Sequence, residues 1–207
     1  MVETSLPVGT AVRAVRHAVR VRGGSGAFIA DPPAYDRARA TVIYGDVSRD
    51  LVLGLIYQGR RHGLVVLGGW MAGAGAELLA EADLIVPVPL HYFRLVRPGF
   101  NQSGWLAAAL PRSSGVRLSV DALKRARATP IQGGMSAAAR RRNVQGAFRM
   151  RASRKALIRG RRVLLVDDVM TTGATAAACA LTVKRTGAAC VDVLTLARVA
   201  GPRTAII

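Results

Sequence analysis

The clearest pattern of apolar and polar positions lies near the end of the chain. Residues 163–166 form a short apolar, partly β-branched run, which is typical of a strand buried on both faces. The run ends at two adjacent carboxylates, Asp167 and Asp168. A turn of small and hydroxyl residues follows, then an alanine-rich helix over 176–186 and a second apolar run over 191–197. This order predicts a βαβ unit with its polar residues at the carboxyl end of the first strand, where open α/β sheets bind ligands.

Shorter periodic segments precede this unit. Strands are predicted at 41–44, 84–86 and 116–118, and helices at 49–58, 75–82 and 104–110. Ser48 is the predicted N-cap of the first helix, because its hydroxyl can accept a backbone N–H. The alternation of strands and helices predicts an α/β fold.

The beginning of the chain follows a different pattern. Residues 11–22 carry valines and arginines that both repeat at helical spacing, which predicts a basic amphipathic helix. Such a helix could lie on a nucleic acid or an anionic membrane, or could be a solvated extension. The glycine-rich segment at 23–26 then suggests a flexible link. We therefore expect a basic N-terminal extension at 1–30 and a folded domain at 31–207.

A second basic stretch spans residues 123–148. Gly133 and Gly134 supply a hinge, Ser136 is a predicted helix cap, and arginines at 140–142 form a charge block. Such a segment could be a mobile lid over an anionic substrate. A solvated basic loop would have the same composition, so this stretch alone leaves both interpretations open.

Length and charge set broad limits. The chain has 207 residues, enough for one substantial core, and a net charge of +18 carried almost entirely by arginine. Such a field attracts polyanions, whether pyrophosphate or nucleic acid. A GC-rich genome would enrich arginine, alanine, glycine and valine together, so the charge alone does not choose a partner.

Other features concern location and metals. No apolar run reaches the roughly 20 residues of a membrane span, and the first residues lack the pattern of a secretion signal, so we expect a cytoplasmic protein. Cys179 and Cys190 are expected to be buried thiols rather than a disulfide. The histidines have no cysteines at zinc-ligand spacing, and no structural zinc is expected.

The turn after residues 163–166 suits a phosphate monoester beside a diol. Gly173 lets the backbone approach a ligand closely, and N–H groups at a helix start attract an anion. The threonine hydroxyls of the turn can donate to phosphate oxygens. The paired carboxylates would repel a phosphate, so we expect them to face ribose hydroxyls or a hydrated Mg²⁺.

A second predicted strand–loop–helix unit has arginines in its loop. The strand at 84–86 runs into Pro87 and Pro89, which cannot continue a ladder of hydrogen bonds. Arg94 and Arg97 follow. Arginines in such a loop suit pyrophosphate binding, and a proline-rich connection beside solvated arginines is the alternative.

Several other classes of site lack their residues. No Gly-x4-Gly-Lys-[Ser/Thr] occurs, which excludes a Walker-type ATPase. A receiver domain would need a phosphoacceptor aspartate at an earlier strand end, and the earlier acidic residues do not sit there. No Ser-His-Asp arrangement is suggested.

The segment 163–175 resembles the phosphoribosyl-pyrophosphate (PRPP) motif of type I phosphoribosyltransferases: a hydrophobic strand, two acidic residues and a Thr-Gly-rich loop. Val-Pro-Val-Pro-Leu at 86–90, Arg-Pro-Gly-Phe-Asn-Gln at 97–102 and Arg-Arg-Arg-Asn-Val-Gln-Gly-Ala-Phe at 140–148 occur in the order of the ComF family, which residues 31–199 resemble. The resemblance implies a type I phosphoribosyltransferase fold: a central, mostly parallel sheet flanked by helices, with a small hood. It also implies a link to DNA uptake in natural competence.

The resemblance also assigns roles to residues. Asp167 and Asp168 would be the catalytic pair and would hold the ribose hydroxyls or Mg²⁺, directly or through water. The PRPP-binding set would be Val166, Asp167, Asp168, Met170, Thr171, Thr172, Gly173, Ala174 and Thr175. The pyrophosphate loop would comprise Pro87, Val88, Pro89, Leu90, Arg94 and Arg97, and the flexible lid Thr129, Gln132, Arg140, Arg141, Arg142 and Asn143.

The chain departs from the family at three places. ComF proteins usually begin with a cysteine-rich zinc ribbon, whereas residues 1–30 contain no cysteine. Ile56 and Ala139 stand where relatives often have a lysine and an acidic residue.

Two hypotheses about function stay open. The first is an enzyme that transfers a phosphoribosyl group to an unknown acceptor with Mg²⁺ and releases pyrophosphate. The second is a binding protein that senses nucleotides or holds single-stranded DNA, although aromatic residues for base stacking are few. Competence proteins and a second copy of the chain are further candidate partners.

Overall fold

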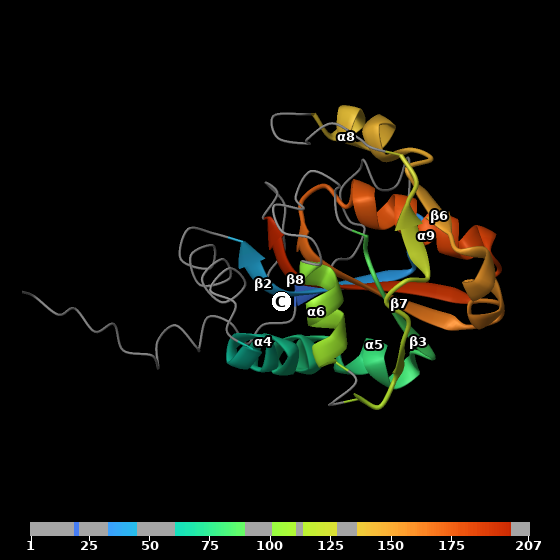
Figure 1. Cartoon of the computed structure of the whole chain (residues 1–207). Helices are drawn as coiled ribbons and strands as arrows, with labels where there is room; N and C mark the ends of the chain where they lie inside the picture. The colour runs from blue at the N-terminus through green and yellow to red at the C-terminus, as the bar shows by residue number, and fades with distance from the viewer. Residues whose placement is uncertain are drawn as a thin grey trace, which may run out of the picture.

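A central sheet with helices on both faces forms the body of the protein in this computed structural model (Figure 1). The structure describes residues 19–20, 33–44, 61–89, 101–110, 114–127 and 136–199. Within these residues the strands are β1 Val19–Arg20, β2 Arg37–Tyr44, β8 Cys190–Val199, β7 Arg162–Met170, β3 Leu84–Pro87 and β4 Arg117–Leu118, in that spatial order. The last five are parallel and β1 is antiparallel to β2, which confirms the predicted fold class.

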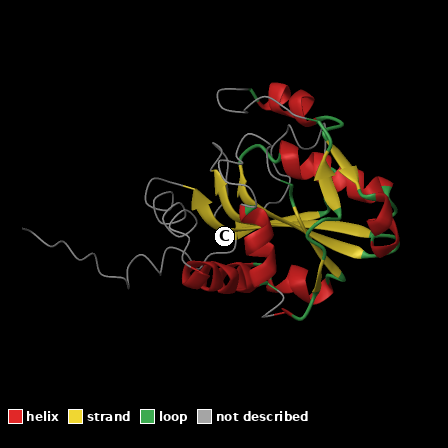
Figure 2. Cartoon of the chain, in the orientation of Figure 1, coloured by secondary structure: helices red, strands yellow, loops and turns green. Residues whose placement is uncertain are grey.

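Three helices cover one face of the sheet (Figure 2). They are α4 Arg61–Ala74, α5 Ala76–Glu81 and α6 Gln102–Ala109. Their apolar side chains bury against alternate residues of the central strands, in a core that includes Leu67, Met71, Leu78, Leu106, Leu164, Val166, Leu194 and Leu196. The burial of this apolar surface stabilises the layer.

The other face carries α9 Ala174–Arg185 and a small hood. The hood consists of a two-stranded antiparallel sheet, β5 Leu123–Arg125 and β6 Phe148–Met150, with α8 Ala137–Val144 and the 3₁₀ helix η2 Ala152–Leu157. A second hydrophobic core lies between these elements and this face of the strands. It includes Val163, Leu165, Val191, Val193, Cys179, Val183 and Phe148. Because both faces are covered, the strands read as continuous apolar runs, as the sequence predicts.

The predicted βαβ unit is confirmed, but its boundaries differ. β7 continues through both aspartates to Met170 instead of ending at residue 166. Its parallel pairing with β8 also continues, joining Asp167 to Thr195 and Met170 to Arg198. The helix starts at Ala174, two residues earlier than predicted, directly after the loop glycine.

Helix α4 is absent from the sequence-based prediction because its glycines argue against a helix. One of them has a packing reason. A Cβ atom on Gly68 would lie 2.5 Å from the Cβ of Ala109, so the missing side chain lets α4 approach α6 closely. Tertiary packing therefore outweighs the low helix propensity.

Two predictions near the start of the chain have different outcomes. A helix over 11–22 is wrong at Val19 and Arg20, which form the edge strand β1 beside Arg39 and Ala40. Pairing with an open sheet edge outweighs the helical spacing there. The predicted helix at 49–58 and its cap Ser48 lie outside the described residues.

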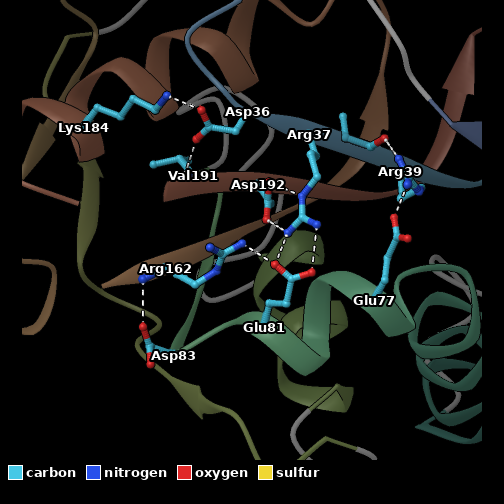
Figure 3. A network of polar contacts seen from close by, with 11 residues as sticks. Asp36, Arg37, Arg39, Glu77, Glu81, Asp83, Arg162, Lys184, Val191 and Asp192 are labelled. Carbon is cyan, nitrogen blue, oxygen red and sulfur yellow. Dashed lines mark hydrogen bonds and ion pairs between the residues drawn. The ribbon is translucent and has the colours of Figure 1, made fainter. Parts of the chain in front are cut away.

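Charged residues gather at the amino ends of the parallel strands (Figure 3). Arg37 of β2 donates to both carboxylate oxygens of Asp192 at 3.1 and 2.7 Å and to both of Glu81 at 3.0 and 2.9 Å. Arg162 also donates to Glu81. Lys184 donates to Asp36 at 2.7 Å. This network joins β2, β8, β7 and α5 at the sheet edge opposite the candidate site.

Among the helices of the described residues, none combines the length and the apolar character needed to cross a membrane.

Candidate functional site

The loop between β7 and α9 has the backbone expected of an anion site. Gly173 has a φ of 75°, a left-handed conformation, and is the N-cap of α9 without a side-chain cap. A Cβ atom there would lie 3.2 Å from the Tyr35 hydroxyl, a tight contact, so the left-handed backbone is the main reason for glycine at this position. Thr171 and Thr172 are exposed and Thr175 is half-buried. The start of α9 can therefore bind an anion through its backbone N–H groups and the neighbouring hydroxyls.

The two aspartates at the end of β7 occupy different environments. Asp167 is buried, and its Oδ1 accepts hydrogen bonds from Ser103 Oγ at 3.1 Å and from the Asp168 N–H at 3.0 Å. Burial and then the charge of Asp168 raise the pKa of Asp167 well above its ordinary value. Asp168 is half-buried, and its Oδ1 accepts from the Val169 N–H at 2.7 Å. Asp168 is thus the more accessible of the pair.

The predicted pyrophosphate loop begins beside these aspartates. Pro87 ends β3 opposite Val166, and the Val88 N–H donates to the Val166 carbonyl at 2.8 Å. Pro87 and Val88 are buried and Pro89 is half-buried. Leu90, Arg94 and Arg97 lie outside the described residues. The structure therefore brings the start of this loop to the same sheet edge as the β7 carboxylates.

The first turn of α6 completes this side of the site. Asn101 is its N-cap and accepts from the Gly104 N–H at 3.0 Å. Ser103 directs its hydroxyl to Asp167. Gln102 is buried, and its Oε1 has no hydrogen-bond partner in the part of the chain that the structure describes. The role of Ser103 was not predicted, although a polar residue at the start of an apolar helix was a usable signal.

The hood contributes a cation near the buried aspartate. Arg125 of β5 lies over the Phe148 ring, with its guanidinium carbon 4.8 Å from the ring centroid. Burial lowers the pKa of Arg125, while electrostatic interactions with Cys179 and Asp167 act in the opposite direction. This proximity of Arg125 to Asp167 was not predicted, because the sequence does not reveal the β5–β6 pairing.

The predicted lid residues fall into two groups. Ser136 caps α8 by accepting from the Ala139 N–H at 3.3 Å, as predicted. Arg141 and Arg142 are exposed on α8, while Arg140 and Asn143 are half-buried. Arg127 donates to the carbonyls of Asn143 and Gln145 at 2.9 and 3.0 Å, which joins α8 to the β5 side of the hood. Thr129 and Gln132 lie outside the described residues.

Two residues outside the predicted site lie against the anion loop. Tyr35 is buried, with its hydroxyl beside Gly173. Burial raises the pKa of Tyr35, and the positive charge of Arg198 partly offsets this increase. Arg198 ends the apolar part of β8 and pairs with Met170, the last residue of β7. An arginine after an apolar run was the available signal for Arg198; Tyr35 had none.

The cysteines and possible metal ligands have simple environments. Cys179 is buried and Cys190 is half-buried, and both are free thiols. Burial, followed by the charge of Asp167, raises the pKa of Cys179 well above its ordinary value. Within the described residues, no group of three or more histidine, cysteine, aspartate or glutamate side chains could hold a metal ion. Of the two carboxylates at the end of β7, Asp168 is the accessible one and is the group that could contact a largely hydrated Mg²⁺, a cation that prefers hard oxygen donors.

The chain is similar to a known domain family and to named bacterial proteins. Residues 72–206 match the family model described as "Phosphoribosyl transferase domain". DNA utilization protein YhgH of Escherichia coli O6:H1 is 37% identical over 161 residues, covering 78% of this chain and 63% of that protein. Competence protein F of Haemophilus influenzae is 42% identical over 93 residues, covering 45% of this chain and 40% of that protein. The chain thus spans less than two thirds of the length of these curated relatives.

Solved structures are also similar. An allosteric regulatory enzyme of purine biosynthesis aligns with a TM-score of 0.45 and 20% identity over 70% of this chain and 30% of that one. TT1426 from Thermus thermophilus aligns with a TM-score of 0.39 and 23% identity over 69% of this chain and 86% of that one.

The family match covers the strands, the loop and the helix that build the site, and the named relatives agree with the ComF resemblance of the sequence motifs. The chain belongs to the phosphoribosyltransferase domain family.

Proposed function

We propose that the protein binds PRPP or a related ribose phosphate, together with Mg²⁺, at the carboxyl edge of its parallel sheet. The observation that carries this proposal is the placement of half-buried Asp168 near the end of β7, shortly before a loop that enters α9 through left-handed Gly173. A carboxylate suits the ribose diol, and the uncapped helix start suits the 5′-phosphate. Both groups lie at the carboxyl end of β7, as one ribose phosphate requires.

In the proposed ligand complex, different residues bind different parts of the ligand. The backbone N–H groups of 171–175 bind the 5′-phosphate, and Asp168 orients the ribose hydroxyls. Asp167 holds the first turn of α6 through Ser103. The backbone of Pro87–Pro89, at the end of β3, binds the pyrophosphate. Bound Mg²⁺ would supply positive charge to the pyrophosphate oxygens.

We further propose that the site transfers the phosphoribosyl group. A nucleophilic atom of the acceptor forms a bond to C1′ while the bond from C1′ to the pyrophosphate oxygen breaks, and pyrophosphate leaves with that electron pair. Positioning and charge stabilisation account for such a reaction without a protein nucleophile. The acceptor has no chemical signature in the described residues. The free thiols fit a reducing cytoplasmic location, which we include in the proposal.

Calorimetric titration of PRPP with Mg²⁺ tests the binding proposal. We expect saturable binding by the wild type and a loss of about tenfold or more in Asp168→Asn, since a carboxylate hydrogen bond is removed. Asp83→Asn is the matched control, because it removes the same charge from an exposed residue at the opposite sheet edge. Absence of binding by the wild type would refute the proposed function.

A second candidate function is a non-catalytic protein that senses nucleotides or holds single-stranded DNA. The favouring observation is that residues 122–166, which include the hood, contain many arginines and no aspartate or glutamate. Pyrophosphate release in a screen of nucleobase acceptors separates the candidates. Release supports the transferase, whereas PRPP binding without release, combined with salt-dependent binding of single-stranded DNA, supports the binding protein. Competence proteins or a second copy of the chain are proposed partners in either case.

A further inference from the structure

Arg198 differs from three other arginines of the parallel strands, Arg37, Arg39 and Arg162. Each of these three binds a carboxylate of α5: Arg37 and Arg162 bind Glu81, and Arg39 binds Glu77. Arg198 lies at the carboxyl edge and is half-buried. Its Nε atom is buried without a hydrogen-bond partner in the described part of the chain. The Nε of Arg162 is buried without a partner as well, but a terminal nitrogen of Arg162 binds Glu81, whereas no ion pair of Arg198 occurs among the described residues.

The surroundings of Arg198 connect it to the anion loop. It pairs across the sheet with Met170, the residue directly before the loop. Tyr35, which experiences its charge, places a hydroxyl 3.2 Å from the position that a Gly173 Cβ would take. The same position is 3.8 Å from Met170 Sδ. Arg198, Tyr35, Met170 and Gly173 thus form one cluster behind the loop.

Physical chemistry favours an anion as the missing partner. A buried N–H of a charged group without an acceptor is costly, and structures normally supply one. Because Arg198 as a whole is only half-buried, its terminal guanidinium nitrogens are the donors that could bind two oxygens of a phosphate. The loop in front of the cluster is the place where the proposed ligand carries its phosphate.

We propose that Arg198 is a binding residue for the 5′-phosphate of the ribose-phosphate ligand, approaching it from β8 while the loop N–H groups approach from α9. The proposal rests on the proposed function and adds a charged side chain to a 5′-phosphate site otherwise built from backbone N–H groups and threonine hydroxyls. Arg198 would favour phosphorylated ribose over ribose itself. The Tyr35 hydroxyl lies where it can support the same phosphate.

Calorimetry with ribose 5-phosphate, ribose and PRPP tests this role. We expect Arg198→Gln to weaken ribose 5-phosphate binding about 10- to 100-fold, the effect of losing a charged hydrogen bond, and Arg198→Lys to fall between it and the wild type. Arg185→Gln is the matched control, because Arg185 is exposed at the far end of α9. We expect the control to bind like the wild type.

The outcomes separate the two proposals. If the wild type binds neither PRPP nor ribose 5-phosphate, the proposed function fails and this inference fails with it. If the wild type binds and Arg198→Gln binds equally well, only the role of Arg198 is refuted.

A measurement on the wild type guards against a variant that does not fold. The ¹⁵N NMR signal of the Arg198 Nε–H, assigned by its absence in Arg198→Lys, should shift on addition of ribose 5-phosphate and stay in place with ribose. An unchanged signal at saturating ribose 5-phosphate would overturn the inference.

Discussion

At the scale of single residues, the site depends on differences between neighbours that look equivalent in the sequence. Asp167 and Asp168 form one acidic pair in the motif, yet Asp167 is buried against Ser103 and Asp168 remains accessible. The motif identifies both carboxylates as site residues, but it does not predict that one is buried and the other accessible. This difference arises because α6 packs against the end of β7. Arg198 and Tyr35 likewise join the site through pairing and packing that no local pattern encodes.

We predict that Asp167→Asn stabilises the fold at neutral pH. Its pKa is raised in the folded state, so its stabilising contribution is present below the unfolded value near pH 4 and is lost as the pH rises through the folded value. Asparagine keeps the acceptor for Ser103 and removes the buried charge. We expect the melting midpoint at pH 7.5 in metal-free buffer to rise by about 2–4 °C, equivalent to roughly 1 kcal/mol for a chain of this size. A lower midpoint than that of the wild type would contradict this assignment.

Gly173→Ala tests the loop backbone. The left-handed φ of 75° and the nearby Tyr35 hydroxyl both oppose a side chain, so we expect a loss of about 1–2 kcal/mol in unfolding free energy and weaker PRPP binding. Gly160→Ala is the control: its φ is 68°, and a Cβ there would meet no atom within 4 Å. Chemical denaturation should show a loss in both variants, and calorimetry a loss of affinity in Gly173→Ala alone. Equal PRPP affinity in the two variants would remove the loop from the site.

At the scale of elements, strong periodic segments are predictable and paired or glycine-rich ones are not. The β7–α9–β8 unit follows from its apolar runs and the small residues between them. Helix α4 was missed because the fit of Gly68 against Ala109 is a property of two helices together. The β5–β6 pairing was missed because its strands are short and separated by the basic segment that contains α8. Local sequence carries little information about such non-local pairing.

Ser136→Ala tests whether the cap holds α8 in the hood. The Ser136 hydroxyl accepts from the Ala139 N–H, and losing such a cap costs about 0.5–2 kcal/mol. We expect faster hydrogen exchange of the α8 amides in the variant, with the α9 amides unchanged. Ser153→Ala, in exposed η2, serves as the control. Unchanged exchange in α8 would show that packing on α9, rather than the cap, orders this helix.

At the scale of the whole molecule, the two edges of the parallel sheet have different chemistry. The amino edge carries a network of mutually paired charges, including Arg37, Glu81 and Asp192 (Figure 3). The carboxyl edge carries the buried Asp167, the anion loop and Arg198, whose buried Nε has no partner within the described residues. Stability and ligand binding are thus assigned to opposite edges.

This division predicts the acid response of the fold. Hydrogen bonds from Arg37 lower the pKa of Glu81; for Asp36, burial acts to raise the pKa, but Lys184 and the Val191 N–H lower it overall. Groups with lowered folded pKa values stabilise the protein above their unfolded values and lose this contribution as the pH falls through the folded ones, here below about pH 4. We expect Glu81→Gln to lower the melting midpoint at pH 7 and to show a smaller further loss at pH 3 than the wild type. Parallel midpoint curves for variant and wild type would contradict the role of this network.

The most direct measurement is a crystal structure of the protein with PRPP and Mg²⁺. We expect the 5′-phosphate to lie against the N–H groups of residues 171–175 and the Arg198 guanidinium, with the ribose hydroxyls at Asp168 and the pyrophosphate toward Pro87–Pro89. A ligand bound instead along the arginines of the hood, with the β7–α9 loop empty, would contradict it.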